Sequence, residues 1–237
     1  MLEALRAKGR SFTQIYVQKG KKESSLKEMI QLAKEQNTRV TYAAKEILDQ
    51  ITGTLKHQGV VGIGASKRYD TIDQLLEFSR QRGEASFFLI LDEIEDPRNL
   101  GAILRTAEGG GVHGVILPTR RSAGITETVA KTSAGAIEYV KVVQVVNIVQ
   151  TIEFLKTEGI WIYGLDGGAD ANYLQMDYTA PVAFVLGGEA KGLRPLVKQN
   201  CDMTVSIPMR GKIQSLNVST AAGIVVYEAL RQRSRKK

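Results

Sequence analysis

Two polar residues on one predicted helix, Asn99 and Arg105, have side chains suited to binding a ligand. Asp96 is a good helix N-cap and Pro97 a good first helical residue, so the sequence predicts a helix over residues 97–109. Its apolar stripe consists of Leu100, Ile103, Leu104 and Ala107. At about 100° per residue, Arg105 lies about 150° and Asn99 about 90° from the centre of that stripe. Both side chains are therefore expected to be free to act on a ligand, and a guanidinium there can hold a phosphate or stabilise developing negative charge.

A second segment places a carboxylate at the end of a buried strand. The apolar run VAFVL, residues 182–186, leads directly into Gly187, Gly188 and Glu189. Open α/β sheets bind ligands at the carboxyl ends of their strands, and glycines let the backbone approach a bound molecule closely. We therefore expect Glu189 at a ligand site, although it could instead cap a helix that begins near Leu193.

A third segment joins a polar loop to the start of the last helix. Pro208 and Gly211 bracket the loop, and a helix is predicted from about Asn217 to Arg233. The polar residues at its start are Ser215, Asn217, Ser219 and Thr220. N-capping accounts for one or two of these residues, so the remainder indicate contact with a ligand.

The glycines of GGGVHG match the spacing of a dinucleotide-binding fingerprint but lie in the wrong context. That fingerprint follows a strand and opens a helix, so that a pyrophosphate meets the helix N-terminus. Gly109, Gly111 and Gly114 instead follow a helix and lead into a strand. We interpret them as a helix stop and a tight return to the sheet.

Composition and charge indicate a globular protein with an acidic partner. The chain has 237 residues, of which 43% are hydrophobic and 24% charged, and its formal net charge is +7. Residues 1–84 hold 15 basic and 10 acidic side chains, and residues 231–237 add five basic ones, so residues 85–230 carry a net −3. The excess basic charge therefore lies outside the three segments, which favours nucleic acid as the partner.

The sequence contains no feature of a membrane, secreted or metal-binding protein. It lacks a run of eighteen apolar residues and a signal peptide, so we expect a cytoplasmic protein that does not associate with a membrane. One cysteine, Cys201, and two histidines, His57 and His113, offer no credible metal site.

The order of elements predicts two α/β domains. Residues 1–65 alternate short helices and strands, and residues 85–237 form the second domain. Residues 66–84 are charged, contain one amphipathic helix, and are expected to form a linker. In the second domain strands alternate with helices, and FFLIL at residues 87–91 is a continuous apolar run. This pattern predicts a parallel sheet covered on both faces.

The three segments, read in order, resemble the SpoU branch of the SPOUT RNA 2′-O-methyltransferases. They are DPRNLGAILRTA from Asp96, LGGEAKGL from Leu186 and IPMRGKIQSLNVSTAAGIVVYE from Ile207. The resemblance implies a fold with a deep trefoil knot, S-adenosylmethionine as the cofactor, and a homodimer. The N-terminal domain resembles the domain that binds the RNA substrate in ribosomal members of the family, and that domain is itself similar to the ribosomal protein L30e type. The segment HQGVVG, from His57, matches an element of enzymes that modify a guanosine of large-subunit (23S) ribosomal RNA.

The resemblance also implies a role for each matched position. Asn99 and Arg105 correspond to the family's substrate-side asparagine and catalytic arginine, and Glu189, Ser215 and Asn217 complete the expected catalytic set. The cofactor-binding residues implied by the match are Leu186, Gly187, Ile207, Met209, Leu216 and Asn217. Because a guanidinium stays protonated in proteins, we expect Arg105 to grip the neighbouring phosphate and stabilise the developing alkoxide rather than to remove a proton.

Two other functions are compatible with the same residues. One is a transfer-RNA ribose methyltransferase, although such relatives usually carry short helical extensions where this chain has a folded domain. The other is an RNA-binding ribosome assembly factor without turnover. Against the second stand Asn99, Arg105, Glu189, Ser215 and Asn217, which are all present.

Overall fold

The chain folds into two compact units, residues 1–68 and residues 69–237. The computed structural model describes the whole chain except residues 23, 25, 56, 190 and 236–237. Each unit has its own hydrophobic core. No described helix is long and apolar enough to cross a membrane.

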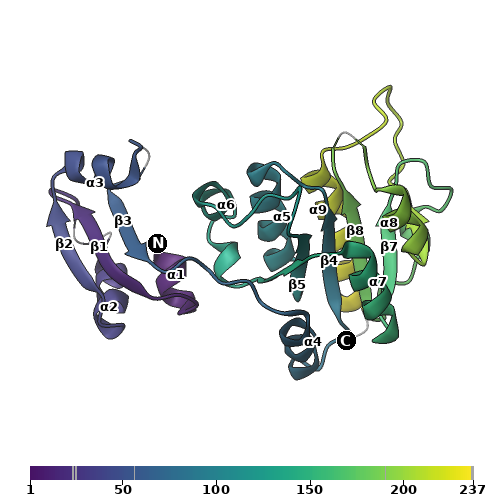
Figure 1. The fold of residues 1–237 in the computed structure, drawn as a ribbon, viewed down its shortest axis with the longest axis horizontal. Helices are drawn as coiled ribbons and strands as arrows, with labels where there is room; N and C mark the ends of the chain where they lie inside the picture. Colours follow the sequence, from purple (N-terminus) through teal and green to yellow (C-terminus); the bar gives the residue numbers. More distant parts are fainter. Residues whose placement is uncertain (23, 25, 56, 190, 236–237) are drawn as a thin grey trace. The chain divides into compact units, whose positions relative to one another are not determined.

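The N-terminal unit is a three-stranded mixed sheet with helices on its faces (Figure 1). Its elements are α1 (Leu2–Ala7), β1 (Phe12–Gln18), α2 (Lys27–Glu35), β2 (Arg39–Ala43), α3 (Lys45–Thr52) and β3 (Val60–Gly64). The sheet order is β2-β1-β3, with β1 parallel to β2 and antiparallel to β3. Leu5, Ile15 and Ala33 pack in the main core of this unit, and Leu48 packs on the other face of the sheet. The predicted alternation of elements is confirmed.

The C-terminal unit is a six-stranded sheet in which every pairing is parallel. Its strands are β4 (Phe87–Asp92), β5 (Gly114–Pro118), β6 (Lys141–Val145), β7 (Trp161–Leu165), β8 (Val182–Gly187) and β9 (Met203–Val205). Their order is β6-β5-β4-β8-β7-β9. β4 and β8 lie at the centre, and β4 is buried along its whole length, as expected for a strand covered on both faces. The predicted parallel sheet is confirmed.

Helices cover both faces of this sheet (Figure 1). α5 (Pro97–Gly109), α6 (Glu127–Thr132) and α9 (Val218–Ser234) pack on one face. α4 (Ile72–Gln81), α7 (Ile148–Thr157) and α8 (Pro195–Asn200) pack on the other. Two short 3₁₀ turns, Ala136–Glu138 and Tyr173–Gln175, complete the unit. α5 begins as predicted, because the Asp96 carboxylate accepts the N–H of Arg98 at 2.7 Å.

The segment predicted as a linker, residues 66–84, differs from that prediction. It contains α4, whose capping box joins Thr71 to Gln74, and whose Leu75 and Leu76 are buried in the core of the C-terminal unit. The compact C-terminal unit therefore starts at Tyr69, and only residues 66–68 of the segment lie before it. The amphipathic helix predicted in this segment is present, but it belongs to the C-terminal unit and not to a linker.

The structure explains the three glycines of the apparent fingerprint without a nucleotide. α5 ends at Gly109, and Gly111 follows in the left-handed region with a φ of 70°. A Cβ on Gly114 would lie 2.3 Å from the side chain of Leu75, so glycine is needed there for close packing of β5 against α4. The interpretation of the motif as a helix stop is confirmed.

Candidate functional site

Three side chains from distant parts of the sequence form one hydrogen-bonded cluster. The Asn99 amide, in the first turn of α5, donates to the Glu189 carboxylate just after β8. The Asn217 amide donates to the Asn99 Oδ1 at 3.1 Å and to Glu189 Oε1 at 3.4 Å. Asn217 Oδ1 in turn accepts the backbone N–H and the hydroxyl of Ser219, so the N-cap of α9 holds this side chain in place. The cluster joins the three predicted segments at the carboxyl edge of β4 and β8.

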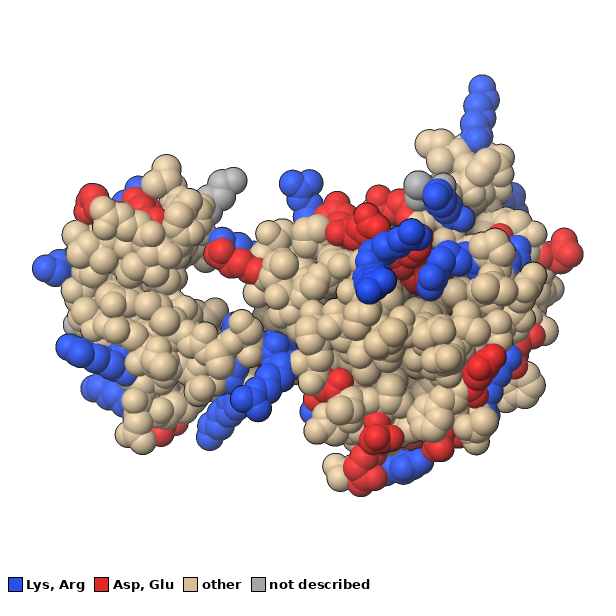
Figure 2. Space-filling model, in the orientation of Figure 1, with Lys and Arg blue, Asp and Glu red and all other residues tan. Residues whose placement is uncertain are grey.

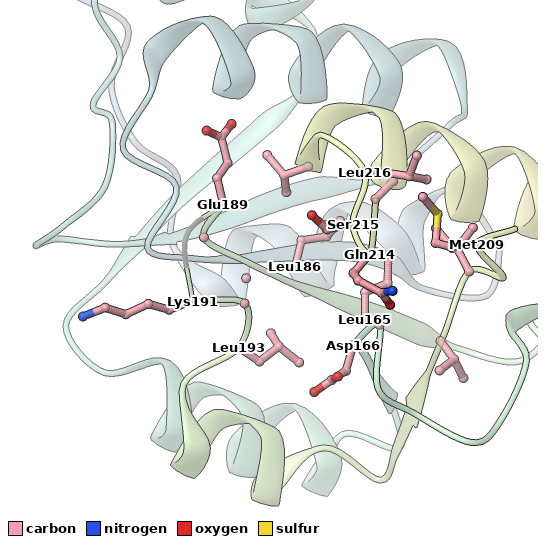
Figure 3. Close-up of a pocket in the computed structure, with 18 residues that line it drawn as sticks. Leu165, Asp166, Leu186, Glu189, Lys191, Leu193, Met209, Gln214, Ser215 and Leu216 are labelled. Carbon is pink, nitrogen blue, oxygen red and sulfur yellow. The ribbon is translucent and has the colours of Figure 1, made fainter. Parts of the chain in front are cut away.

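A cavity of about 340 Å³ lies beside this cluster (Figure 3). It is built from the segments that follow β7, β8 and β9 and from the start of α9. The lining residues are Leu165, Asp166, Gly167, Leu186, Gly187, Gly188, Glu189, Lys191, Gly192, Leu193, Val205, Ile207, Met209, Gln214, Ser215, Leu216, Val218 and Ala221. Apolar side chains supply much of the wall, and Glu189, Asp166 and Gln214 add polar groups, which is the usual make-up of a pocket for one small organic molecule.

Close backbone packing closes one side of the cavity. A Cβ on Gly187 would lie 2.1 Å from the carbonyl carbon of Gly192, and a Cβ on Gly188 would lie 2.7 Å from the carbonyl oxygen of Glu93. Gly192 itself has a φ of 64°, which favours glycine. The glycines of LGGEAKGL therefore allow residues 191–193 to fold tightly back on the end of β8.

The structure brings most of the predicted site residues together. Among the predicted cofactor-binding residues, those on the cavity wall are Leu186, Gly187, Ile207, Met209 and Leu216, together with Glu189 and Ser215 from the predicted catalytic set. Asn217 does not line the cavity but belongs to the polar cluster next to it. The predicted groups thus form two adjoining parts of one site.

Asn99 and Arg105 differ from each other in exposure. Asn99 was expected to point freely toward a ligand, but its side chain is buried and engaged with Glu189 and Asn217. Arg105 is exposed and forms no hydrogen bond or ion pair with another described residue. It lies six residues further along α5, about 9 Å along the helix axis from Asn99. Of these two residues, only the arginine is therefore available to a bound substrate.

Glu189 does not cap a helix. The next helix, α8, begins at Pro195, and its N-cap residue is Arg194, which makes no side-chain capping bond. The alternative structural role of Glu189 is therefore wrong, because its carboxylate is used by the amides of Asn99 and Asn217.

Sequence reasoning missed the contribution of β7 to the cavity. Leu165, Asp166 and Gly167 line it where β7 ends. The Lys198 ammonium lies 2.5 Å from the Asp166 carboxylate, and this ion pair, with the N–H of Gly168, holds the pKa of Asp166 below its usual range. β7 ends at Leu165, so the rule about carboxyl edges would have pointed to Asp166 if β7 had been known to neighbour β8.

No group of three metal-ligating side chains comes together among the described residues. The free thiol of Cys201 is half-buried, and burial raises its pKa to about 12. The thiol therefore stays protonated at neutral pH, as expected for a cysteine in a packing role.

The fold and the site define an α/β enzyme that binds one small organic molecule next to an amide and carboxylate cluster. The chain belongs to the SpoU rRNA methylase family, whose model matches residues 86–227, and the model for RNA 2′-O ribose methyltransferase substrate binding matches residues 1–70. The methyl donor of that family is S-adenosylmethionine. The predicted family is therefore confirmed.

Individual relatives agree with this assignment. A protein of Bacillus subtilis named as a member of the TrmH family of tRNA/rRNA methyltransferases is 46% identical over 87% of this chain and 83% of its own. The 23S rRNA (guanosine-2′-O-)-methyltransferase RlmB of Neisseria meningitidis is 42% identical over 94% of this chain and 89% of its own. The crystal structure of the SpoU methyltransferase AviRb of Streptomyces viridochromogenes with its cofactor AdoMet superposes with a TM-score of 0.83 at 24% identity, covering 99% of this chain and 89% of that one, which confirms the fold.

Proposed function

We propose that this protein transfers a methyl group from S-adenosylmethionine to a ribose 2′-hydroxyl of RNA, and that its substrate is a guanosine of 23S ribosomal RNA. The observation that carries the proposal is the position of the Asn99, Glu189 and Asn217 cluster beside the small-molecule cavity, with the unengaged Arg105 on the same helix as Asn99. The relative from Neisseria meningitidis supports the choice of 23S rRNA.

The cavity residues fit such a cofactor. The volume of the cavity, about 340 Å³, lies within the range of roughly 300–1,000 Å³ that is usual for small-molecule sites. Leu186, Ile207 and Leu216 offer apolar walls for a flat base, and Gly187 and Gly188 line the cavity without side chains that would fill it. When bound, the cofactor supplies a methyl group on a positively charged sulfur.

The protein residues then have to hold the ribose hydroxyl in line. Positioning of reactants can lower a reaction barrier by roughly 7–11 kcal/mol, so we assign to positioning the main share of the rate enhancement. The exposed guanidinium of Arg105 grips the phosphate next to the target ribose and stabilises negative charge that develops on the 2′-oxygen. The cluster, in which Asn99 is buried and Glu189 and Asn217 are exposed, holds Glu189 through two amides and so keeps this part of the cavity wall in one shape.

The role of Arg105 is tested by replacing its fork-shaped donor with a point charge. Arg105→Lys keeps the charge but loses bidentate phosphate contact, so we expect methyl transfer to fall by at least tenfold while cofactor affinity stays within twofold. The measurement is single-turnover transfer of labelled methyl to 23S rRNA, with calorimetric titration of the cofactor. Near-normal transfer by Arg105→Lys would show that a fork-shaped donor is not needed.

The N-terminal unit supplies basic side chains for RNA. The Lys19 N–H donates to the carbonyl of Ala43, which places the ends of β1 and β2 side by side, and exposed Lys19, Lys21 and Lys45 follow these ends. Figure 2 shows lysine and arginine side chains on the surface of the protein. A basic edge of this kind suits a phosphate backbone, and residues 1–70 match a substrate-binding model.

The substrate is best identified by mapping ribose methylation in cells with and without the gene. Loss of one 2′-O-methylguanosine in 23S rRNA is the expected result. Loss of a transfer-RNA mark instead would favour the tRNA enzyme that the relatives' names also allow. An unchanged methylation pattern, with RNA binding retained in vitro, would favour an assembly factor.

The trefoil knot and the homodimer that the resemblance implies stay predictions. We expect sedimentation velocity at micromolar concentration to give the mass of two chains. A monomer under these conditions would contradict the dimer.

A further inference from the structure

A fully buried carboxylate lies at the carboxyl end of the central strand β4. Asp92 has no exposed surface, and Arg194 supplies three hydrogen-bond donors to its carboxylate. The Arg194 backbone N–H reaches Oδ2 at 3.2 Å, and the Nε and Nη2 of its guanidinium reach Oδ1 at 2.8 and 2.6 Å. This contact raises the pKa of Arg194 above its usual value. An ionised carboxylate without water depends on such partners.

Asp92 and Arg194 close the loop that forms one wall of the cavity. Asp92 is the ladder partner of Gly187, where the loop begins, and the ion-pair partner of Arg194, where it ends. Within the loop, the Gly192 N–H donates to the Gly188 carbonyl at 2.9 Å. Between these two anchors, five of the residues that the structure describes line the cavity, and one of them is Glu189. Both ends of the cavity wall are therefore attached to one residue of β4.

Two further charged residues connect this ion pair to the segment that follows the neighbouring strand, β5. Glu93 lies 3.9 Å from Arg194 and 3.0 Å from Arg121, which follows β5. Glu93 and Arg121 both have positive φ, at 61° and 54°, a conformation that non-glycine residues adopt at a cost. Such conformations persist where the surrounding structure holds them, and here the alternating charges join the segments that follow β5, β4 and β8.

We propose that Asp92 and Arg194 are a positioning pair that holds residues 187–189 and 191–193 in the conformation required for cofactor binding and for the contact between Glu189 and Asn99. Neither residue is among the cavity-lining residues, so the pair acts through the loop. The inference rests on the proposed function for the identity of the cofactor. The order of the loop itself does not depend on that function.

The first test measures the loop directly. In Arg194→Gln the guanidinium is removed but a polar side chain stays, and we expect the backbone amides of residues 187–193 to exchange hydrogen at least tenfold faster than in the wild-type protein. Arg80→Gln is the matched control, since Arg80 forms a 2.6 Å ion pair with Glu158 on the surface, away from the cavity. It should leave exchange in the loop unchanged.

The second test measures cofactor binding. We expect Arg194→Gln to raise the Kd for S-adenosylhomocysteine, used as the probe, at least tenfold in calorimetry well below the unfolding temperature. Arg194→Lys, which can place one donor on Asp92 Oδ1 where the guanidinium places two, should recover part of the affinity. The double variant Asp92→Asn with Arg194→Gln should lose less than the product of the single losses, because both changes break one interaction.

The outcomes separate this inference from the proposed function. If Arg194→Gln is folded and both loop exchange and Kd stay within twofold of wild type, the pair has no positioning role. If exchange rises but the wild-type protein does not bind the probe, the positioning role stands and the proposed cofactor is wrong. One further outcome would overturn the inference. It is that Arg194→Gln loses affinity only because the protein is partly unfolded, as a lower unfolding temperature would show, and that Arg194→Lys recovers none of the affinity.

Discussion

The side-chain amide of Asn99 donates a hydrogen bond to the carboxylate of Glu189, 90 residues later in the chain. The contact joins the first turn of α5 to the loop after β8, and these two elements follow the central strands of the sheet. Asn217 completes the contact from a third segment. The polar cluster is thus assembled across the carboxyl edge of β4 and β8, next to the cavity.

Removing the Asn99 amide should lower the rate of methyl transfer more than the affinity for the cofactor. Asn99→Ala leaves the Glu189 carboxylate with one amide partner instead of two, while the cavity wall stays intact because Asn99 does not line it. We expect at least a tenfold fall in single-turnover transfer and a change in cofactor Kd below threefold. Asn200→Ala, which removes an amide bonded only to the Leu196 carbonyl, is the control. Equal rates for both variants would contradict a role for the cluster.

A single methyl group on Gly187 should deform the cavity. Its Cβ would lie 2.1 Å from the Gly192 carbonyl carbon, and backbone atoms cannot move aside as a side chain would. Gly187→Ala is therefore expected to lower the free energy of unfolding by roughly 1–3 kcal/mol and to weaken cofactor binding. Gly223→Ala, in α9 with no atom within 4 Å of the new Cβ, should be neutral or stabilising. Chemical denaturation and calorimetry measure both effects, and equal behaviour of the two variants would be evidence against the tight loop.

Stability should fall as the pH drops below about 6.5, partly because of His113. Burial lowers the pKa of this imidazole, although Glu84 opposes the shift. Its Nδ1 accepts the N–H of Phe87 at 3.0 Å, so the neutral ring is the folded form. The unfolded chain therefore takes up the proton first as pH falls, and the free energy of unfolding decreases with it until the lower folded pKa is passed.

The test is urea denaturation between pH 7.5 and 5.5, where most carboxylates stay ionised. His113→Asn keeps an acceptor for Phe87 but cannot take up a proton, so its stability should change less with pH than that of the wild-type protein. The variant His57→Asn measures how much the other histidine contributes to the change of stability with pH. If wild type and His113→Asn lose the same stability across this range, the buried imidazole is not responsible.

Arg233 should contribute strongly to the attachment of α9. Its guanidinium donates to the carbonyls of Tyr178, Ala85, Ser86 and Ala180 at 2.7–3.1 Å. Burial lowers its pKa to about 10, so it still carries its charge at neutral pH. Arg233→Ala removes a donor from all four carbonyls, of which Ser86 keeps the N–H of Val182, and we expect a loss of about 2–4 kcal/mol in the free energy of unfolding.

Arg231→Ala is the comparison for this change, since Arg231 is an exposed arginine on the same helix and its partner Glu228 keeps a bond from Gln232. Its effect on the denaturation midpoint should be clearly smaller. Similar midpoints for the two variants would show that the four carbonyls do not depend on Arg233.

Local sequence determined most of the elements, since the physics that forms them is local. Asp96 and Pro97 start α5 where predicted, the glycines after it stop the helix, and the apolar run of β4 is buried on both faces. The same reasoning predicted an amphipathic helix within residues 66–84 but not that Leu75 and Leu76 of α4 pack in the core of the C-terminal unit, because the unit against which a helix packs depends on tertiary contacts.

What the sequence by itself determined was the set of segments that carry the chemistry, because each segment holds its polar residues, glycines and caps within one short stretch. Only the tertiary structure decided which groups face a ligand. Asn99 is buried by Glu189 and Asn217, Arg105 stays exposed, and Asp166 joins the cavity. These outcomes depend on strand order and on contacts between residues about a hundred positions apart, and no periodicity along the chain contains that information.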